Sequence, residues 1–478
     1  MTHGPVPVLQ GVMVGDQRGH PWAEELVSWV AEPAALQRSP TSWVLIVSGP
    51  VAPRRGLVAA LMKAVLLQGG VAAYSDYRVG QRLVSPGGWS VERARWRDYT
   101  GPVLLVRADL VPDTVPDLRV AALAAASRSG TVIHVPEVLY RCEWREREID
   151  PGQRTMALRE AGVPYRLTPD GMARELTTAK ITVVIPTRGV TGEVRGESTR
   201  FVDHAIASIE GTHDHAGLDY VLVVDTDAPV DFADEWRRRL GSRVTVVPVD
   251  PPFNFAAKVN AGAAVATGEV LAIVNDDVEV ITPEALRTMA TVAGENDVGA
   301  VGALLRYEDG SVQHAGQAFA ADGVHHVATG RSRGWLRRFA DLLVDRDVTG
   351  VTAACLVQRR VVWEQSGGMD PRFPVNFNDV EYCWRLRQQG LRIVQCNTVE
   401  WFHFESRSRR AGAEGWEVEL LRERMGLDTM LWDPLTPAPA VRPTPGERRR
   451  TALGRLRGRV SGALAREPDE DSGPGLPA

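Results

Sequence analysis

The chain has 478 residues and a net charge of −5, with 44% hydrophobic and 24% charged residues. These values are ordinary for a soluble globular protein of two or three domains, and they give no global reason to expect nucleic-acid binding. The N-terminus does not resemble a signal peptide, and no apolar run approaches the ~18–20 residues that span a bilayer. We therefore expect a cytoplasmic protein whose membrane contact, if any, is peripheral.

The first predicted domain covers residues 1–175. Residues 43–48, Trp-Val-Leu-Ile-Val-Ser, form an apolar run that predicts a strand, followed by a helix that ends near Leu67. A second apolar run, 133–141, lies near the end of this region. These elements indicate an α/β unit shorter than the one that follows it.

From residue 181 the chain alternates apolar runs with helical segments. Helices are predicted at 203–209 and 256–266. The runs are rich in β-branched residues, as in strands buried on both faces of a parallel sheet, and lie at 181–186, 220–225, 244–249 and 270–275. The alternation predicts a three-layer α/β/α domain, which we place at residues 176–432.

Two adjacent acids, Asp276 and Asp277, follow the last of these runs. Thr282, with proline and glutamate after it, predicts a capped helix start. The acids therefore lie at the carboxyl end of a buried strand, where ligands bind in open α/β sheets. Adjacent acids in a turn are also commonly solvated, or favour a helix start, so the pair alone leaves both interpretations open.

Further along, residues 306–345 are polar and predict a long, partly mobile connection of the kind that is often functional. A helix is predicted from Asn378 to about Gln389, followed by a strand at 391–396. Residues 433–478 change character, with a Pro/Ala-rich linker and then an Arg-rich segment with helical spacing of its apolar residues. That tail is either a frayed solvated helix or a weak contact for an anionic membrane or a partner.

The two domains share a pattern. Where the later strand is followed by Asn-Asp-Asp (275–277), the earlier one is followed by Ser-Gly-Pro (48–50). Arg141 falls where His403 lies in the later domain. We hypothesise that residues 1–175 form a truncated, catalytically silent relative of the second domain.

Several side chains have two interpretations on chemistry alone. Asp379, at a helix start, is either a general base or a residue that favours the helix dipole beside a capping pair of Asn378 and Glu381. His403 is either a packed, hydrogen-bonded residue or a metal ligand. Lys258 lies on the helix before Asp276, either on the surface or within reach of a phosphate.

Nine segments are similar, in this order, to the successive motifs of glycosyltransferase family 2. They are Ile-Pro-Thr-Arg (185–188), Val-Val-Asp (223–225), Asn-Phe-Ala-Ala-Lys-Val-Asn-Ala-Gly (254–262), Gly-Glu-Val-Leu-Ala-Ile-Val-Asn-Asp-Asp-Val-Glu-Val (268–280), Asp-Gly-Ser-Val-Gln-His-Ala-Gly (309–316), Val-Thr-Ala-Ala-Cys-Leu-Val (351–357), Gly-Gly-Met-Asp (367–370), Asn-Asp-Val-Glu-Tyr-Cys-Trp-Arg-Leu (378–386) and Trp-Phe-His-Phe-Glu-Ser (401–406). The match covers about half of the chain.

This resemblance implies a GT-A fold, a type of three-layer α/β/α fold, and an inverting, single-displacement transfer of a sugar. The donor would be a nucleotide-diphospho-sugar, and the acceptor a hydroxyl of a glycan or lipid-linked molecule. It also implies a role in bacterial polysaccharide synthesis, with rhamnose as one candidate sugar. The N-terminal region is similar to a truncated first copy in members that carry two such domains.

Carried over motif by motif, the resemblance implies a donor site. Asp225 would contact the nucleotide base, and Asp276 would lie near the ribose and phosphates. Thr187 and Arg188 would belong to the nucleotide loop after the first strand. Lys258 and Asn260 lie in the motif before the acids and are assigned to the same donor site.

The resemblance also implies a metal site and a base. Asp277 and His403 would hold a divalent cation, Mg²⁺ or Mn²⁺, and Asp379 would take the proton from the acceptor. Two positions depart from the family pattern: Glu381 stands where aspartate is usual, and Asn378 where many relatives have an acid.

Two other classes of protein remain as alternatives. A sugar-nucleotide nucleotidyltransferase would need a glycine-rich, basic loop after the first strand, of which residues 187–190 supply little. A non-catalytic scaffold that binds a glycan or nucleotide-sugar is the third possibility, although the second domain retains its candidate acids. A dehydrogenase is less favoured than either alternative, because no GxGxxG follows a predicted strand.

Overall fold

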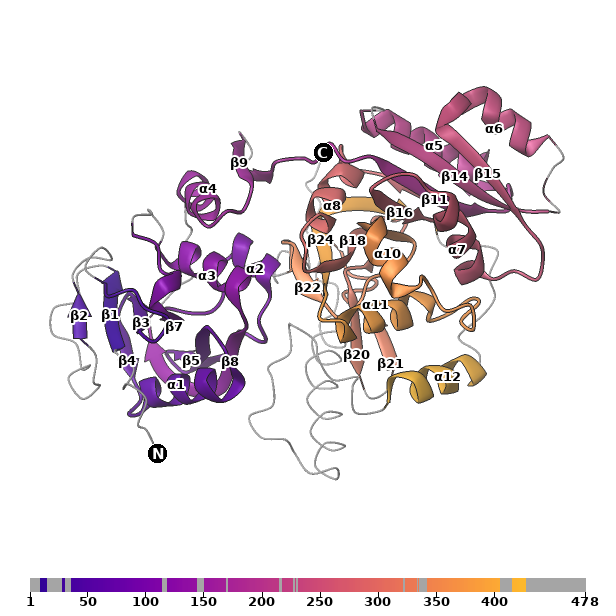
Figure 1. Cartoon of the computed structure of the whole chain (residues 1–478). Coiled ribbons are helices and arrows are strands. Elements are labelled where there is room, and N and C mark those ends of the chain that lie inside the picture. The colour runs from indigo at the N-terminus through magenta and orange to yellow at the C-terminus, as the bar shows by residue number, and fades with distance from the viewer. Residues whose placement is uncertain are drawn as a thin grey trace, which may run out of the picture.

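The computed structural model describes residues 9–14, 28–30, 36–113, 118–143, 150–168, 171–214, 217–226, 228, 231–320, 323–332, 334, 342–404 and 415–426. Two large sheets organise these residues, one in each half of the chain (Figure 1). Among the residues described, no helix is long and apolar enough to cross a membrane. The predicted tail, 433–478, lies outside them, so its membrane contact stays a prediction.

The sheet of the C-terminal half has ten strands. They are β11 (Ile181–Thr187), β14 (Leu218–Asp225), β15 (Val244–Val249), β16 (Val270–Val274), β17 (Val278–Val280), β18 (Val298–Arg306), β19 (Val312–His314), β22 (Arg346–Val348), β23 (Cys355–Arg359) and β24 (Arg392–His403). Their order is β15-β14-β11-β16-β23-β18-β24-β17, with β19 beside β18 and β22 beside β24. The four predicted strands, β11, β14, β15 and β16, are mutually parallel, as expected.

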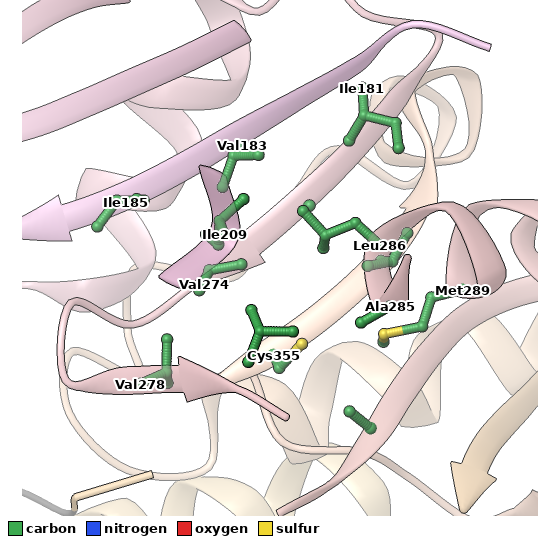
Figure 2. Packing of buried hydrophobic residues seen from close by; sticks show 14 of the residues in the cluster. Ile181, Val183, Ile185, Ile209, Val274, Val278, Ala285, Leu286, Met289 and Cys355 are labelled. Atoms are coloured by element: carbon green, nitrogen blue, oxygen red, sulfur yellow. The ribbon is translucent and has the colours of Figure 1, made fainter. Parts of the chain in front are cut away.

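Helices cover both faces of this sheet. On one face, Ile181, Val183 and Ile185 of β11 pack in a cluster with Ile209 and Leu286 (Figure 2). The helices of that face are α5 (Phe201–Thr212), α6 (Phe232–Leu240) and α8 (Ala285–Ala293). The other face packs against α7 (Phe255–Val265), α10 (Arg360–Ser366) and α11 (Asn378–Gln388), and α12 (Gly415–Met425) lies on α11. Alternate strand residues feed two apolar layers, so the predicted three-layer α/β/α fold is confirmed.

The N-terminal half forms a second mixed sheet. Its strands are β1 (Leu9–Val14), β2 (Ser28–Val30), β3 (Trp43–Ser48), β4 (Val51–Pro53), β5 (Ala72–Val79), β6 (Arg82–Val84), β7 (Val103–Arg107) and β8 (Val132–Cys142). Its helices are α1 (Leu57–Gln68), α2 (Val91–Trp96), α3 (Leu118–Ser129) and α4 (Pro151–Glu160). A hairpin of β9 (Tyr165–Thr168) and β10 (Gly171–Arg174) then leads into β11. We refer to the residues before β11 as the first unit, and to β11 and the residues after it as the second unit.

The two large sheets share one strand order. The first runs β2-β1-β3-β7-β5-β8-β4, and the second contains β14-β11-β16-β23-β18-β24-β17. Each neighbouring pair is parallel in both sheets or antiparallel in both, and β6 lies on β5 as β19 lies on β18. The β5–β8 ladder shifts register between Ser75 and Asp76, and the β18–β24 ladder shifts between Ala303 and Leu304. The agreement therefore extends from topology to a local irregularity.

This register corrects one predicted correspondence. Cys142 pairs with Val51 in the first sheet, as His403 pairs with Val278 in the second. Arg141 lies one residue earlier in the ladder and pairs with Ala52. The residue in the place of His403 is therefore Cys142, because counting along one strand misses the register that its partner strand sets.

Two further local predictions are wrong. The supposed connection at 306–345 contains, among its described residues, β19 and a hairpin of β20 (Gln317–Ala320) and β21 (Gly323–His326). Thr282 does not cap a helix: α8 begins at Ala285, and Thr282 Oγ1 accepts a bond from Glu400 N at 2.9 Å. In the first place, the buried polar residues Gln313, His314 and Gln317 hide the strand pattern. At Thr282, the hydroxyl bonds to the backbone of β24 and not to the first turn of α8.

Candidate active site

Asp276 and Asp277 occupy the turn between β16 and β17. All five residues of β16 are buried, and just after the strand Asn275 N donates to Ala354 O at 3.0 Å. The next strand, β17, pairs with the last residues of β24. The acids therefore lie where the sequence placed them, at the carboxyl end of a buried strand, with a segment of β24 beside them.

The carboxyl group of Asp276 faces the end of β11. Thr187 Oγ1 donates to Asp276 Oδ2 at 2.6 Å. Burial, and after it the negative charge of Asp277, raises the pKa of Asp276 to about 6, while the Thr187 hydroxyl and Lys258 oppose the shift. At neutral pH this carboxylate is ionised in surroundings that neutralise it only in part.

Asp225, at the end of β14, is held by two cations. Lys258 Nζ lies 2.9 Å from Asp225 Oδ1, and Arg188 Nε lies 3.3 Å from Asp225 Oδ2. Lys258 Nζ also donates to Thr187 O at 3.2 Å, and its side chain is only 1% exposed. Lys258 therefore fixes Asp225 and the end of β11 from beneath, whereas the side chain of Arg188, 59% exposed, is the one that solvent reaches.

Asn260 lies on α7 and faces a different partner. Its Nδ2 donates to Met369 O at 2.8 Å, and its Oδ1 accepts from Met369 N at 3.0 Å. A Cβ atom at Gly368 would lie 2.5 Å from the same amide oxygen. These contacts indicate that Asn260 ties α7 to the turn after α10, and its predicted nucleotide contact stays a prediction.

His403 ends β24 beside Asp277. Its Nε2 lies 3.2 Å from Asp277 Oδ1 and 3.2 Å from Asn275 Nδ2. On the other side of the ring, Nδ1 lies 2.7 Å from Gln313 Oε1, and Gln313 Nε2 donates to His403 O at 3.3 Å. Because an amide oxygen only accepts, Nδ1 carries a proton in this arrangement, and Nε2 is turned toward the carboxylate.

The Asp277–His403 pair fits a divalent cation by its chemistry. A neutral imidazole nitrogen and a carboxylate oxygen both present lone pairs, so their close approach is favourable when a proton or a cation lies between them. Both side chains are 12% exposed. Among the residues described, no group of three or more His, Cys, Asp or Glu side chains is arranged to hold an ion. Hard divalent cations commonly take further ligands from phosphate oxygens and from water.

Asp379 lies in the first turn of α11 and contacts the segment before β23. Ala353 N donates to Asp379 Oδ2 at 3.1 Å, and Val380 N donates to Oδ1 at 2.7 Å. The capping pair considered from the sequence is wrong. Phe377 is at the N-cap position without a side-chain bond, and Asn378 donates to Val375 O at 3.2 Å.

Glu381, the other member of that pair, does not reach back to the helix start. Its carboxylate accepts from Arg385 Nε at 2.8 Å and pairs with Arg424 at 3.3 Å. Its side chain is fully buried in this ion pair. The departure from the usual family residue at Glu381 therefore concerns packing between α11 and α12.

Two residues of β19 complete the site and were given no role from the sequence. Gln313 orients His403, as described above. His314 Nε2 accepts from Thr352 N at 3.4 Å, one residue before the amide that binds Asp379, and burial lowers the pKa of His314 well below its usual range. Both lie in the segment 309–316, whose resemblance to a family motif was the available signal.

A family model described as glycosyltransferase like family 2 matches residues 179–424, about half of the chain. A protein of Sinorhizobium fredii (strain NBRC 101917 / NGR234), named uncharacterized protein y4gI, is 34% identical over 260 residues, which are 53% of this chain and 27% of that protein. The O-antigen biosynthesis protein RfbC of Myxococcus xanthus is 32% identical over 358 residues, 68% of this chain and 27% of that protein. The chain thus spans about a quarter of the length of these relatives.

Among solved structures, the chain is similar to the mannosyltransferase PcManGT from Pyrobaculum calidifontis in complex with GDP-Man and Mn²⁺. The TM-score is 0.37 at 14% identity, over 63% of this chain and 77% of that one. It is also similar to GalNAc-T7 with UDP, GalNAc and Mn²⁺, with a TM-score of 0.39 at 14% identity over 49% and 45%. The family model agrees with the order of the motifs and with the three-layer fold that carries them. The chain belongs to glycosyltransferase like family 2.

Proposed function

We propose that the chain transfers a sugar from a nucleotide-diphospho-sugar to a hydroxyl group of a glycan or lipid-linked acceptor. One observation carries the proposal: Asn275, which precedes the two acids, bonds to Ala354, which follows the amide that holds Asp379. The donor-side acids and the candidate base therefore flank one junction between β16 and β23. Such a junction suits a reaction between two substrates.

The donor side is built on β11, β14 and β16. Asp225 is oriented by buried Lys258 and accepts the nucleoside, and Asp276, held by Thr187, lies toward the ribose and phosphates. Arg188 is the exposed cation of this group and faces the diphosphate charge. The donor is thus recognised by an ionised carboxylate and a guanidinium on adjacent strand ends.

Asp277 and His403 are the residues that would hold a divalent cation, Mg²⁺ or Mn²⁺. A cation bound there would stabilise the negative charge that develops on the leaving diphosphate. Gln313 keeps His403 in the tautomer that leaves Nε2 available for this purpose. The support for the assignment is the opposed pair of lone-pair donors described above.

Asp379 is the proposed general base. The acceptor oxygen attacks the anomeric carbon as the bond from that carbon to the diphosphate breaks, and the hydroxyl proton passes to the carboxylate. A single displacement of this kind inverts the anomeric configuration. The two backbone N–H groups on Asp379 leave lone pairs on both oxygens for the proton, and they fix the carboxylate without neutralising it.

The sugar and acceptor follow from the relatives only as proposals. The name of the Myxococcus xanthus relative refers to O-antigen biosynthesis, which favours a surface polysaccharide as the product of this chain too. Rhamnose remains one candidate sugar. A panel of nucleotide-sugars, with and without Mn²⁺ or Mg²⁺, tests the assignment by release of nucleoside diphosphate in the presence of an acceptor.

The first unit is proposed to be a silent copy of the second. Besides the shared strand order, Arg119 is the second residue of α3, as Asp379 is of α11, and both helices lead into the matching strands β8 and β24. Arg119 is buried and pairs with Asp98 at 2.7 Å. Among the described residues of this copy, a buried arginine stands in the place of the base and Gly49-Pro50 in the place of the acids.

Calorimetry on the full chain separates these points. We expect one donor site per chain, and a second site of similar affinity would contradict the silent copy. Asp277→Ala should weaken donor binding in Mn²⁺ and make it insensitive to chelator, whereas Asp109→Ala, which removes an exposed acid of the first unit, should bind as wild type. Donor binding by wild type that ignores chelator would disprove the metal assignment.

A further inference from the structure

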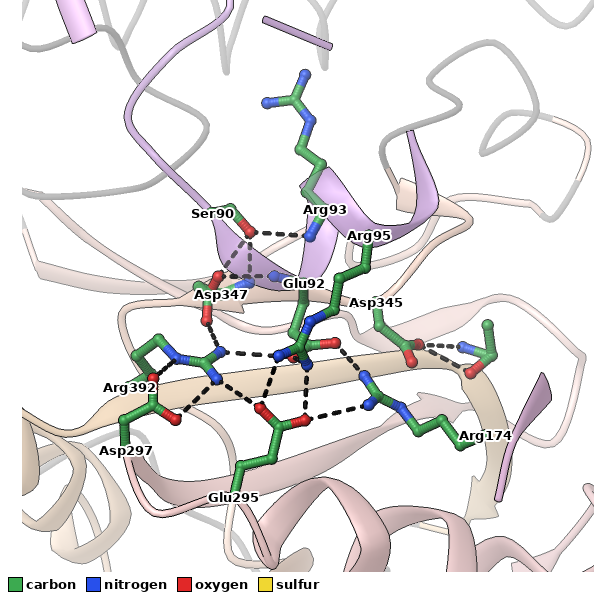
Figure 3. A network of polar contacts seen from close by, with 11 residues as sticks. Ser90, Glu92, Arg93, Arg95, Arg174, Glu295, Asp297, Asp345, Asp347 and Arg392 are labelled. Carbon is green, nitrogen blue, oxygen red and sulfur yellow. Dashed lines mark hydrogen bonds and ion pairs between the residues drawn. The ribbon is translucent and has the colours of Figure 1, made fainter. Parts of the chain in front are cut away.

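The two units meet where α2 of the first lies against β22 of the second (Figure 3). Ser90, the N-cap of α2, donates from Oγ to Asp347 Oδ2 at 2.8 Å and accepts from Asp347 N at 2.9 Å. Glu92 N donates to the same Asp347 oxygen at 3.2 Å. Asp347 thus completes the N-terminal cap of a helix in the other unit, and both Asp347 and Ser90 are buried.

Around this cap lies a network of buried ion pairs. Arg95 bridges Glu92 and Glu295, each at 2.6 Å, and Arg174 binds the same two acids. Arg392 reaches Asp347 at 2.7 Å, Asp297 at 2.7 Å and Glu295 at 3.1 Å. Each of these charged groups has a partner in its own unit. Three pairs cross between the units: Arg95 and Arg174 each reach Glu295, and Arg392 reaches Glu92 at 3.5 Å.

The strand held in this way is short. β22 has three residues, and its one ladder is with β24. A three-residue strand with one ladder makes few hydrogen bonds to its sheet. The cap contact with α2 fixes the side of β22 that the ladder leaves uncovered.

From β22 the chain continues into residues 349–354, one of which bonds to the candidate base. Gly350 O accepts from Gln317 N at 2.7 Å, and Ala353 N donates to Asp379 Oδ2 at 3.1 Å. Ala354 O then accepts from Asn275 N, next to the donor-side acids. Residues 349–354 therefore connect Asp347 to the backbone amide that bonds to the base.

We propose that the first unit is a positioning element for catalysis: the N-terminus of α2 fixes Asp347 and, through residues 349–354, the orientation of Asp379. This inference rests on the proposed function of Asp379. No atom of the first unit enters the reaction. The first unit acts on Asp347 through Ser90 and the backbone of α2. This contact lies on the side of the candidate base, away from the donor strands.

Ser90→Ala is the variant that tests this coupling. It removes one hydroxyl and keeps the ion pairs. Asp150→Ala is its matched control, because Asp150 also caps a helix of the first unit, accepting from Gln153 N at 3.0 Å, and does not touch the interface. Asp347→Asn is the second variant, since it keeps the shape of the side chain and loses the charge that pairs with Arg392.

Three quantities are measured for each variant: kcat, donor KM and the hydrogen-exchange rate of segment 346–354. Ser90→Ala and Asp347→Asn should lower kcat about tenfold, with donor KM within about twofold of wild type, because a displaced base slows the chemical step and leaves the donor strands intact. Exchange at 346–354 should become faster in both, and Asp150→Ala should change none of the three quantities.

Wild-type kcat in Ser90→Ala and Asp347→Asn would overturn the proposal. So would an equal loss of kcat and donor affinity, which indicates general loss of the fold, and so would unchanged exchange at 346–354. A wild-type protein that transfers no sugar from any donor is a different failure, that of the proposed function. In that case faster exchange in the two variants still supports the structural coupling, because exchange is read without activity.

Discussion

The two sheets of this protein agree in strand order and disagree in the residues at two matching places. After β16 the second unit carries Asp276 and Asp277, and after β3 the first carries Gly49 and Pro50. At the second position of α11, the helix before β24, the second unit has the half-buried Asp379. At the second position of α3, the helix before β8, the first unit has the buried Arg119. The first sheet shows that this strand order forms without acids after its third strand, so the acids of the second unit call for a functional explanation.

The largest expected effect is on the second unit. Asp379→Asn should lower kcat for sugar transfer by about 10³-fold, because an amide does not take up the acceptor proton, while donor affinity stays close to wild type. Steady-state kinetics with calorimetric donor titration measure both. Normal turnover in this variant would remove Asp379 from the role of base and, with it, the main difference between the two helices.

The matching change in the first unit should affect stability only. Arg119→Met removes the guanidinium that pairs with the buried carboxylate of Asp98, which should destabilise the first unit by about 3 kcal/mol. Hydrogen exchange on β5 and β8 during urea unfolding reports this loss. A variant as stable as wild type would mean that the Arg119–Asp98 pair contributes little, and that the place of the base in the first unit is simply vacant of function.

Asp276 predicts a pH dependence of the stability of the second unit. The pKa of Asp276 in the folded state, about 6, is raised above its unfolded value. The contribution of this protonated group to the free energy of unfolding is therefore fully present below about pH 4, and it is lost as the pH rises through 6. Asp276→Asn removes this loss. In chelator, the variant should be more stable than wild type by about 2 kcal/mol at pH 7.5 and equal to it at pH 4, as measured by unfolding at both pH values. A difference that does not vary with pH would contradict the raised pKa.

The smallest effect concerns β19 and its counterpart. Gln313 orients His403, whereas β6 carries Arg82, Leu83 and Val84. Gln313→Ala should weaken Mn²⁺ affinity about tenfold, since the imidazole loses the partner that fixes its tautomer. Titration of Mn²⁺ in the presence of donor measures the change. Gln153→Ala on α4 is a control of the same type outside the site, and it should bind Mn²⁺ as wild type.

Much of this comparison could be predicted from local pattern. The four parallel strands and the placement of Asp276 and Asp277 at a strand end follow from runs of β-branched residues and the turn after them. The side chain of Lys258 illustrates the limit. Its helix could be predicted, but whether its ammonium met a phosphate or Asp225 depends on how α7 packs across β14.

The long-range pairings could not be predicted in the same way. His403 reaches Asp277 because β17 pairs with the end of β24, and nothing near either residue encodes that register. The sequence predicted Arg141 as the counterpart of His403 instead of Cys142 for the same reason. The role of Gln313 was hidden because a polar residue on a buried three-residue strand resembles a loop.

The ladder shift that both sheets share also carries a history. If the first unit is the silent copy proposed above, a register displaced at both Ser75 and Ala303 is more simply inherited once than acquired twice. On that proposal the ancestral sheet would already have had its last strand bent at this point. The acids would then have been lost from the first unit after the doubling.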